Sequence, residues 1–210
     1  MEENLAFTTV ERATVKLPEK GGQGVLVTGG VIMTAAHCID CTCDGSMVLG
    51  DYFIIEIETT SQNLKVQPLA VEPISDIAIL GSLDGQVFPE EDDKFMEFCR
   101  ATDPVPLDLK EFRPKQKMGI HIYTHEGTWV AGTVMAMKKD ANILYLEADD
   151  IIKGGTSGGP IVNDSGELVA VASMVSESEG DTKSSGMVPR PHLALPFWVL
   201  HEYFGLNLRL

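Results

Sequence analysis

Residues 154–160 read Gly-Gly-Thr-Ser-Gly-Gly-Pro, so that Ser157 is enclosed by small residues on both sides. Glycine adopts backbone angles that other residues avoid, and it lets a ligand approach the main chain closely. Backbone N–H groups on such a loop can stabilise a negative charge that develops during a reaction. The stretch is therefore either a turn rich in small residues or a loop that presents Ser157 as a nucleophile, and the rest of the chain has to decide.

Short apolar or alternating runs fill most of the chain around this loop, and Gly, Asp, Asn and Ser separate them. These runs are rich in Val, Ile, Thr and aromatic residues, which favour β-strands. The clearest are GVLVT, YFIIEIET and IAILGS before residue 85, and MGIHIYT, WVAGTVMAM and ELVAVASMV after residue 115. This spacing predicts an all-β barrel or sandwich rather than alternating βαβ units.

Two segments depart from the β pattern. Residues 89–114 are charged, contain several prolines and show little alternation, which indicates a surface connection between two β units. The stretch LPFWVLHEYFGLNL near the C-terminus has apolar residues at helical spacing and predicts an amphipathic helix. We expect a single domain over 1–210 that contains a first β unit, a linker, a second β unit and a helix, over residues 1–100, 101–116, 117–195 and 196–205.

Composition argues against two classes of partner. The 210 residues carry a formal net charge of −15, so that the surface repels phosphate backbones and no nucleic acid is expected as a partner. The chain has no run of about 18 apolar residues, and we therefore expect no membrane span. The N-terminal stretch has early acids and no apolar core, unlike a secretory signal, which favours a cytoplasmic location.

The four cysteines are Cys38, Cys41, Cys43 and Cys99, and three of them fall in the stretch HCIDCTC. Cys41 and Cys43 are too close to pair comfortably with each other, and without a secretory signal we expect free thiols in a reducing compartment. The stretch could bind zinc, but it lacks the second, distant ligand pair that structural zinc sites normally have. We expect no metal site, and a metal-binding regulatory protein stays an alternative that metal analysis would test.

Two further segments supply the groups that an activated serine needs. The stretch TAAHC, residues 34–38, ends an apolar run with a histidine, and SDIAIL, residues 75–80, has an acid directly before a buried-looking strand. A serine hydroxyl is a poor nucleophile at neutral pH and needs an adjacent general base, a task that suits a neutral imidazole. A carboxylate then holds the imidazole in the correct tautomer. The three segments together predict acyl-transfer chemistry.

In this order, and on a β-rich background, the three segments resemble the chymotrypsin- and trypsin-like serine peptidases. The similarity runs from about Ala13 to the C-terminal helix, and it is to the intracellular-type or HtrA-like branch without a PDZ domain. It implies an all-β fold of two six-stranded antiparallel Greek-key β-barrels with a C-terminal α-helix. It also implies a serine endopeptidase that cleaves polypeptide substrates through a covalent acyl-enzyme and needs no cofactor.

The resemblance implies a role for each residue of the three motifs. His37 matches the general base, Asp76 the acid that orients it, and Ser157 the nucleophile. The N–H groups of Gly155 and Ser157 match the oxyanion hole, which stabilises the tetrahedral intermediate. A protease-like binding module, with all of these residues but a closed oxyanion loop, is the alternative that the sequence leaves open.

The resemblance also implies a substrate-binding region, in which Ser173 would lie beside Asp76. The other lining residues would be Met174 and Val175 beside the peptide, Gly186 on the pocket wall, and Ile151 and Ile152 at the pocket entrance. A trypsin-type pocket has an acid at its base, whereas this chain has Ile151 at the matching position. We therefore expect an apolar P1 side chain, aliphatic or medium-sized aromatic.

Two positions depart from the family pattern. Digestive members pair the cysteine after the histidine with one sixteen residues earlier, but Gly22 stands at that place. Zymogen-type members have an Asp directly before the nucleophile, which receives a new N-terminal ammonium, whereas this chain has Thr156. We therefore expect the oxyanion loop to be ordered in another way, either constitutively or by an activating protein partner. The remaining histidines are expected to be structural or exposed, and they are His121, His125, His192 and His201.

Overall fold

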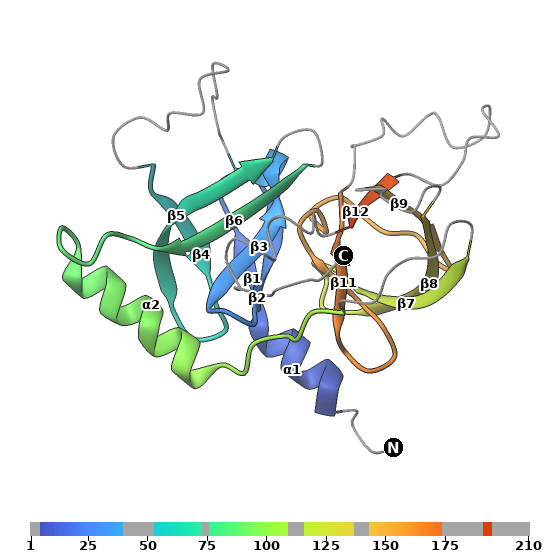
Figure 1. The fold of residues 1–210 in the computed structure, drawn as a ribbon, viewed down its shortest axis with the longest axis horizontal. Coiled ribbons are helices and arrows are strands. Elements are labelled where there is room, and N and C mark those ends of the chain that lie inside the picture. The colour runs from blue at the N-terminus through green and yellow to red at the C-terminus, as the bar shows by residue number, and fades with distance from the viewer. Residues whose placement is uncertain are drawn as a thin grey trace, which may run out of the picture.

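Two β-barrels lie side by side in the computed structural model, which describes residues 5–39, 53–72, 76–108, 116–136, 143–173 and 191–194 (Figure 1). Each barrel is closed, antiparallel and built from six strands of the described chain. The predicted fold of two six-stranded antiparallel barrels is therefore confirmed. The helix predicted over 196–205 lies outside the described residues.

The first barrel has the strand order β1-β2-β3-β6-β5-β4, so that β6, and not β4, pairs with β3, as in a Greek key. β2 and β3 are buried along their whole lengths, and apart from Gln23 their residues are apolar or small. β4 alternates between buried and exposed residues and has one face toward solvent. The strands are β1 (Thr14–Leu17), β2 (Gly22–Val27), β3 (Val31–Ala35), β4 (Ile55–Glu58), β5 (Asn63–Glu72) and β6 (Ile77–Ser82).

The second barrel repeats this order as β10-β11-β12-β9-β8-β7. β7 and β8 pair along their whole lengths in a hairpin, and the inward residues of β7 are apolar. β11 is fully buried, as its sequence LVAV predicts. The strands are β7 (Lys117–Tyr123), β8 (Trp129–Ala136), β9 (Ile143–Ala148), β10 (Pro160–Val162), β11 (Leu168–Val171) and β12 (Pro191–Ala194).

The segment predicted as a surface connection contains a helix, α2 (Pro89–Ala101), that the alternation pattern did not predict. Pro89 begins the helix, where its missing N–H costs nothing, and the acids of the first turn suit the positive end of the helix dipole. Phe95 and Phe98, one helical turn apart, are both buried against the first barrel. The later prolines lie beyond the end of the helix, so that they do not interrupt it.

A second unpredicted helix, α1 (Leu5–Ala13), and the connection after α2 both join the barrels. The ring of Phe7 packs on the second barrel, while Val10 and Ala13 belong to the core of the first. Val105 pairs with Val27 of β2, and two residues later the same connection bridges to β11. Among the described residues, no helix is long and apolar enough to cross a membrane.

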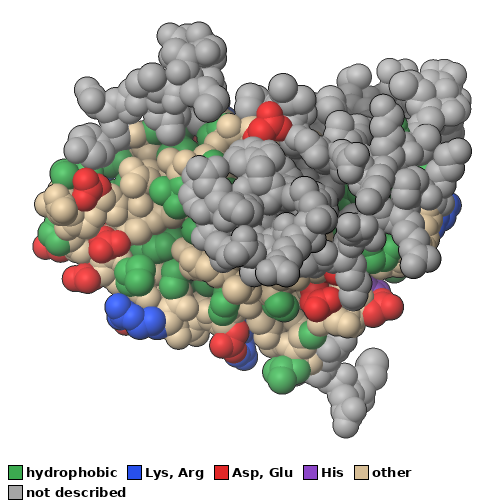
Figure 2. Space-filling view, in the orientation of Figure 1, with side chains coloured by type: hydrophobic (Ala, Val, Ile, Leu, Met, Phe, Trp, Pro, Cys, Tyr) green, Lys and Arg blue, Asp and Glu red, His purple; other side chains and the backbone are tan. Residues whose placement is uncertain are grey.

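The core continues across the boundary between the barrels. Three residues of the second barrel, Val162, Leu168 and Val171, belong to the apolar cluster of the first barrel. The interior of the second barrel forms a separate cluster around Ile122, Val134 and related residues. Figure 2 shows more acidic than basic side chains on one face of the described surface, in line with the net charge of −15.

Candidate active site

His37 lies where β3 ends. The strand ends at Ala35, and a single 3-10 turn, Ala36–Cys38, follows it. Within this turn Ala36 and Cys38 are buried while His37 is exposed. The turn therefore anchors the backbone on both sides and leaves the imidazole at the surface.

Asp76 is fixed against this turn by three contacts. It stands directly before β6, which pairs with β3 through Ile77 and Ala35. Its carbonyl accepts the N–H of Ala36 and its Oδ1 accepts the N–H of His37, both at 2.8 Å, while its Oδ2 lies 2.7 Å from Nδ1 of His37. Asp76 is also the one described non-glycine residue with a positive φ, 56°, which aspartate tolerates better than most residues. The carboxylate thus holds both the backbone and the ring of His37.

Ser173 adds a further contact, because its Oγ donates to Oδ2 of Asp76 at 2.5 Å. The resemblance implies this neighbour. Burial alone raises the pKa of Asp76, but the hydrogen bonds from His37 and Ser173 outweigh burial and hold the pKa below its usual value. The carboxylate therefore stays ionised beside the imidazole.

The imidazole of His37 is correspondingly basic. Its hydrogen bond with Asp76 is the main cause that raises the pKa of His37 from 6.5 to about 10. The neighbouring Cys38 thiol also raises the pKa, whereas partial burial lowers it. With a proton on Nδ1 directed at Asp76, Nε2 is the atom that can accept a proton from a nucleophile.

The loop that carries Ser157 adopts backbone angles that favour glycine. Gly155 and Gly158 have φ values of 91° and 77°, in a region that side chains rarely allow. The N–H of Gly158 donates to the carbonyl of Ala172 at 2.6 Å, which ties the loop to the second barrel. Ser157 itself is only 6% exposed, so that its position is well defined by packing.

The same loop docks on the first barrel. The carbonyl of Ser157 accepts the N–H of Gln23 in β2 at 2.7 Å, and a Cβ at Gly158 would collide with the carbonyl oxygen of Gln23. Gly22 lies between the two motifs, because a Cβ there would be 3.1 Å from the carbonyl oxygen of Ser157 and 2.5 Å from Sγ of Cys38. The structure therefore brings the serine loop and the histidine turn together where the barrels meet.

Two N–H groups of the loop are the candidates for the oxyanion hole that the resemblance implies. Among the residues that the structure describes, neither the N–H of Gly155 nor that of Ser157 donates to another protein group. Backbone N–H groups buried away from water are nearly always paired, so that unpaired ones at the surface of a site suit an incoming oxygen.

The structure places only part of the expected substrate-binding region. Ile151 is 81% exposed, and Ile152 is half-buried against the core of the second barrel. Met174, Val175 and Gly186 lie outside the described residues. The described residues therefore include only some of the residues that we expect to line the P1 pocket.

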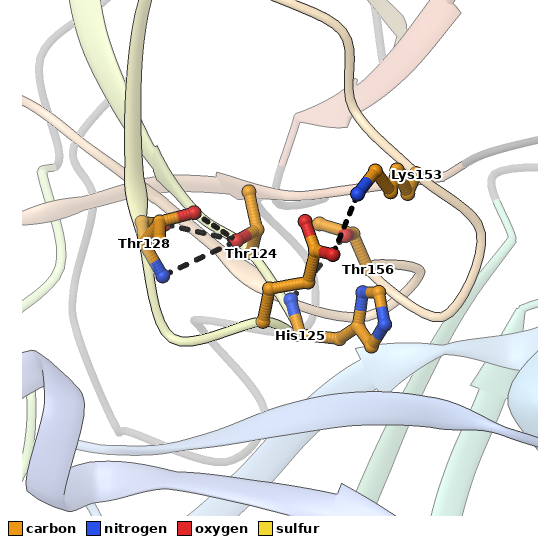
Figure 3. A network of polar contacts seen from close by, with 6 residues as sticks. Thr124, His125, Thr128, Lys153 and Thr156 are labelled. Carbon is orange, nitrogen blue, oxygen red and sulfur yellow. Dashed lines mark hydrogen bonds and ion pairs between the residues drawn. The ribbon is translucent and has the colours of Figure 1, made fainter.

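The serine loop has neighbours that the sequence motifs did not single out. His125, expected to be structural or exposed, has its ring against Gly155, at 3.1 Å from the position that a Cβ would occupy. Beside it, Nζ of Lys153 pairs with Oε1 of Glu126 at 2.7 Å (Figure 3). No local pattern marks this contact, since it depends on how the β7–β8 hairpin folds against a loop thirty residues away.

Cys38 and Cys99 are free thiols, as expected, and Cys41 and Cys43 lie outside the described residues. In the described part of the chain, no three His, Cys, Asp or Glu side chains gather into a group that could hold a metal ion. Most of the stretch HCIDCTC lies outside the described residues, which end at residue 39 in this part of the chain.

Known proteins resemble this chain in sequence and in fold. The family model of the trypsin-like peptidase domain matches residues 22–171. Serine protease HTR4 from Rattus norvegicus is 28% identical over 159 residues, which is 74% of this chain and 30% of the relative. The chain thus spans less than a third of the length of that relative.

Two solved structures have the same fold at low sequence identity. The Rv3671c protease from M. tuberculosis in its active form has a TM-score of 0.54 at 14% identity, over 96% of this chain and 83% of that one. An inactive mutant form from M. tuberculosis H37Rv has a TM-score of 0.52 at 14% identity, over 97% and 90%. Since the family model covers most of the chain and the barrels agree with it, the protein belongs to the trypsin-like peptidase family.

Proposed function

We propose that the protein is a serine endopeptidase in which Ser157, His37 and Asp76 form a catalytic triad. The observation that carries this proposal is the way Asp76 is held. Its Oδ2 accepts hydrogen bonds from His37 and Ser173, while its backbone and Oδ1 fix the turn of His37. Non-glycine residues with unfavourable backbone angles gather at active sites, where the surrounding contacts maintain them.

In the first step, Oγ of Ser157 attacks the carbonyl carbon of the scissile peptide bond and its proton passes to Nε2 of His37. The ionised Asp76 stabilises the imidazolium that forms. The oxygen of the tetrahedral intermediate accepts the N–H groups of Gly155 and Ser157, which are free of protein partners among the described residues.

In the second step, Nε2 of His37 gives the proton to the leaving amine, and the C–N bond breaks to leave an ester on Ser157. A water molecule that loses its proton to His37 then attacks the ester carbonyl. Collapse of the second tetrahedral intermediate releases the acid and restores the Ser157 hydroxyl. The sequence of steps requires no cofactor.

We further propose an apolar P1 preference. Ile151 stands where a trypsin-type pocket has its acid, and its exposed side chain adds apolar surface beside the serine loop. A peptide library with varied P1 residues tests this, and a preference for Arg or Lys would contradict it.

Hydrolysis of a casein substrate by the purified protein tests the endopeptidase itself. Replacing Ser157 with alanine is expected to lower the rate by about four to six orders of magnitude, as for other serine nucleophiles. Ser165→Ala is the matched control, because Ser165 is exposed in the β10–β11 turn and its side chain has no place in the site. Cleavage that survives Ser157→Ala would overturn the assignment.

A further inference from the structure

Among the described residues, no buried charge anchors the serine loop. Thr156, directly before Ser157, is completely buried but neutral, and its hydroxyl lies 3.4 Å from the N–H of His125. One long hydrogen bond to a hydroxyl is a weak restraint on a loop with two left-handed glycines. Other contacts must therefore keep this loop in one conformation.

The ring of His125 supplies the contact at Gly155. Its Cγ, Cδ2 and Nδ1 lie 3.1, 3.2 and 3.5 Å from the position that a Cβ would occupy on Gly155. The imidazole thus packs flat against the face of Gly155 that a side chain would cover. The ring therefore leaves little room on this side of Gly155 for the backbone to move.

Nδ1 of His125 is buried without a hydrogen-bond partner in the described structure. A buried polar atom in this state is costly, so that the polar contacts of the ring do not explain its position. Its packing on Gly155 does. Next to it, the ion pair between Glu126 and Lys153 holds the start of the loop, two residues before Gly155 (Figure 3).

The hairpin turn that presents His125 is itself rigid. The hydroxyl of Thr124 lies 2.8 Å from the hydroxyl of Thr128 and accepts the N–H of the same residue at 3.3 Å. Gly127 completes the turn with a φ of 77°, and its N–H donates to the carbonyl of Thr124 at 2.9 Å. These contacts within residues 124–128 fix the turn before any substrate binds (Figure 3).

Helix α1 supports the hairpin from the other side. Nε1 of Trp129, the first residue of β8, donates to Oε1 of Glu11 at 2.8 Å. The ring of Trp129 also contacts the rings of Phe7 and Tyr123 in tilted arrangements, with centroid distances of 4.6 and 5.0 Å. The N-terminal helix thus packs against the hairpin whose turn contacts the serine loop.

We propose that residues 124–128, with Lys153, are a clamp that holds the oxyanion loop in the conformation described above, and that His125 is the positioning residue at its centre. The inference rests on the proposed function, because it assigns the ordering of the same site. If the clamp orders the loop, the loop needs neither the insertion of a new N-terminus nor an activating partner. At Gly155 the clamp acts through the packing of the His125 ring, and at Lys153 it acts through the ion pair with Glu126.

Hydrogen exchange of the full chain, followed by mass spectrometry over residues 153–159, tests the clamp without reference to activity. His125→Ala is expected to speed exchange in this loop by about tenfold or more, and His125→Phe, which keeps a flat ring, to restore most of the protection. His121→Ala is the matched control, because His121 lies in β7, the strand that leads into the turn, but contacts Asp164 and Phe7 instead of the serine loop. Unchanged exchange in His125→Ala would overturn the proposal.

A charge exchange covers the case in which His125→Ala does not fold. Glu126→Lys and Lys153→Glu each replace an exposed side chain, and each is expected to speed exchange over residues 153–159. The double variant restores the pair with reversed charges and is expected to return exchange toward that of the wild type. Single variants that match the wild type, or a double variant no slower than the singles, would contradict the charge contact.

Kinetic measurements distinguish a failure of the clamp proposal from a failure of the proposed peptidase function. In an active wild type, His125→Ala is expected to lower kcat by about 10- to 100-fold with KM changed by less than about twofold, since the oxyanion hole acts in the transition state. An equal kcat in the two proteins would overturn the clamp. A folded wild type that hydrolyses nothing would instead contradict the peptidase proposal, and the exchange data would still decide whether the clamp exists.

Discussion

At the scale of single residues, the contact between Asp76 and His37 sets the working pH of the proposed enzyme. The contact holds the pKa of the carboxyl low and raises that of the imidazole to about 10. The neutral imidazole is the base, so that a higher pKa moves the rise in activity to higher pH. The same pair also makes the free energy of unfolding depend on pH. His37 and Asp76 contribute to that dependence in different pH ranges.

We expect kcat/KM to increase with pH across the neutral range, with its acid limb above 6.5, the unperturbed value of histidine. Asp76→Asn removes the carboxylate that raises the pKa of His37, and it should move this limb to lower pH while reducing the maximal rate. The measurement is a pH profile of kcat/KM for both proteins. A wild-type limb at or below 6.5, or no shift in the variant, would count against the role of Asp76.

Because the folded pKa of His37 exceeds its unfolded value, its contribution to stability is complete below about 6.5 and disappears as pH rises through about 10. The lowered pKa of Asp76 has the opposite dependence, and its contribution disappears as pH falls through the folded value. Urea denaturation at pH 7 and pH 10 should show that Asp76→Asn loses more stability at pH 7. An equal loss at both values would contradict the link.

Gly158 tests the docking of the serine loop on the first barrel. Its φ of 77° and its contact with the carbonyl of Gln23 leave no room for a methyl group. Gly158→Ala should cost about 3 kcal/mol or more in the free energy of unfolding, measured by urea denaturation, because strain and collision add. Gly119→Ala is the control, since a Cβ there meets nothing within 4 Å, and it should change stability by less than about 1 kcal/mol. Similar costs at the two positions would exclude this account of the loop.

The sequence indicates His37, Asp76 and Ser157 because each stands in a short motif whose chemistry is recognisable without coordinates. His125 could not be singled out in this way. Its role in the clamp depends on the ring touching Gly155, thirty residues later in the chain, and a histidine in a hairpin turn is usually an ordinary polar residue. The depth and width of the P1 pocket could not be predicted from the sequence either, because loops that carry no motif decide them.

At the scale of elements, the strands can be predicted from the sequence, whereas the two described helices could not be. β4 alternates and β11 is uniformly apolar, and each pattern follows directly from the number of buried faces. The two helices are short and amphipathic, and each buries only two residues, so that their apolar periodicity is weak. The first turn of α2, which is rich in acids, is typical of a helix start, but the neighbouring prolines favoured an irregular connection.

Helix α1 tests the packing between elements. The ring of Phe7 contacts two rings of the second barrel, that of Trp129 in a tilted arrangement and that of His121 edge-on. Phe7→Ala should lower the free energy of unfolding by about 1–3 kcal/mol, through lost burial and lost ring contacts. Leu5 lies on the same helix but is 79% exposed, and Leu5→Ala should change stability by less than about 0.5 kcal/mol. Urea denaturation of both variants is the measurement, and equal effects would show that α1 is not packed as described.

At the scale of the whole molecule, hydrogen bonds and apolar contacts link the two barrels. Val105 is fully buried in the connection, and its backbone exchanges hydrogen bonds with Leu26 and Thr28 of the first barrel. The carbonyl of Pro106 accepts the N–H of Leu168 in the second barrel at 2.7 Å. Together with the core shared across the boundary, these contacts couple the stability of one barrel to that of the other.

We therefore expect urea to unfold the protein in a single transition, with coincident curves from tryptophan fluorescence and far-UV circular dichroism. Val105→Ala should shift both curves to lower urea by the same amount, corresponding to about 1–3 kcal/mol. Two separate transitions, or a shift in only one signal, would show that the barrels fold independently.

The most direct test of the central claim is fluorophosphonate labelling of the purified protein, read by intact mass. The account predicts one adduct per chain in the wild type, on Ser157, and no adduct in Ser157→Ala or His37→Ala. The Ser165→Ala variant should label like the wild type. A folded wild type that takes no label, or a label that persists without Ser157, would contradict the claim that this loop carries an activated nucleophile.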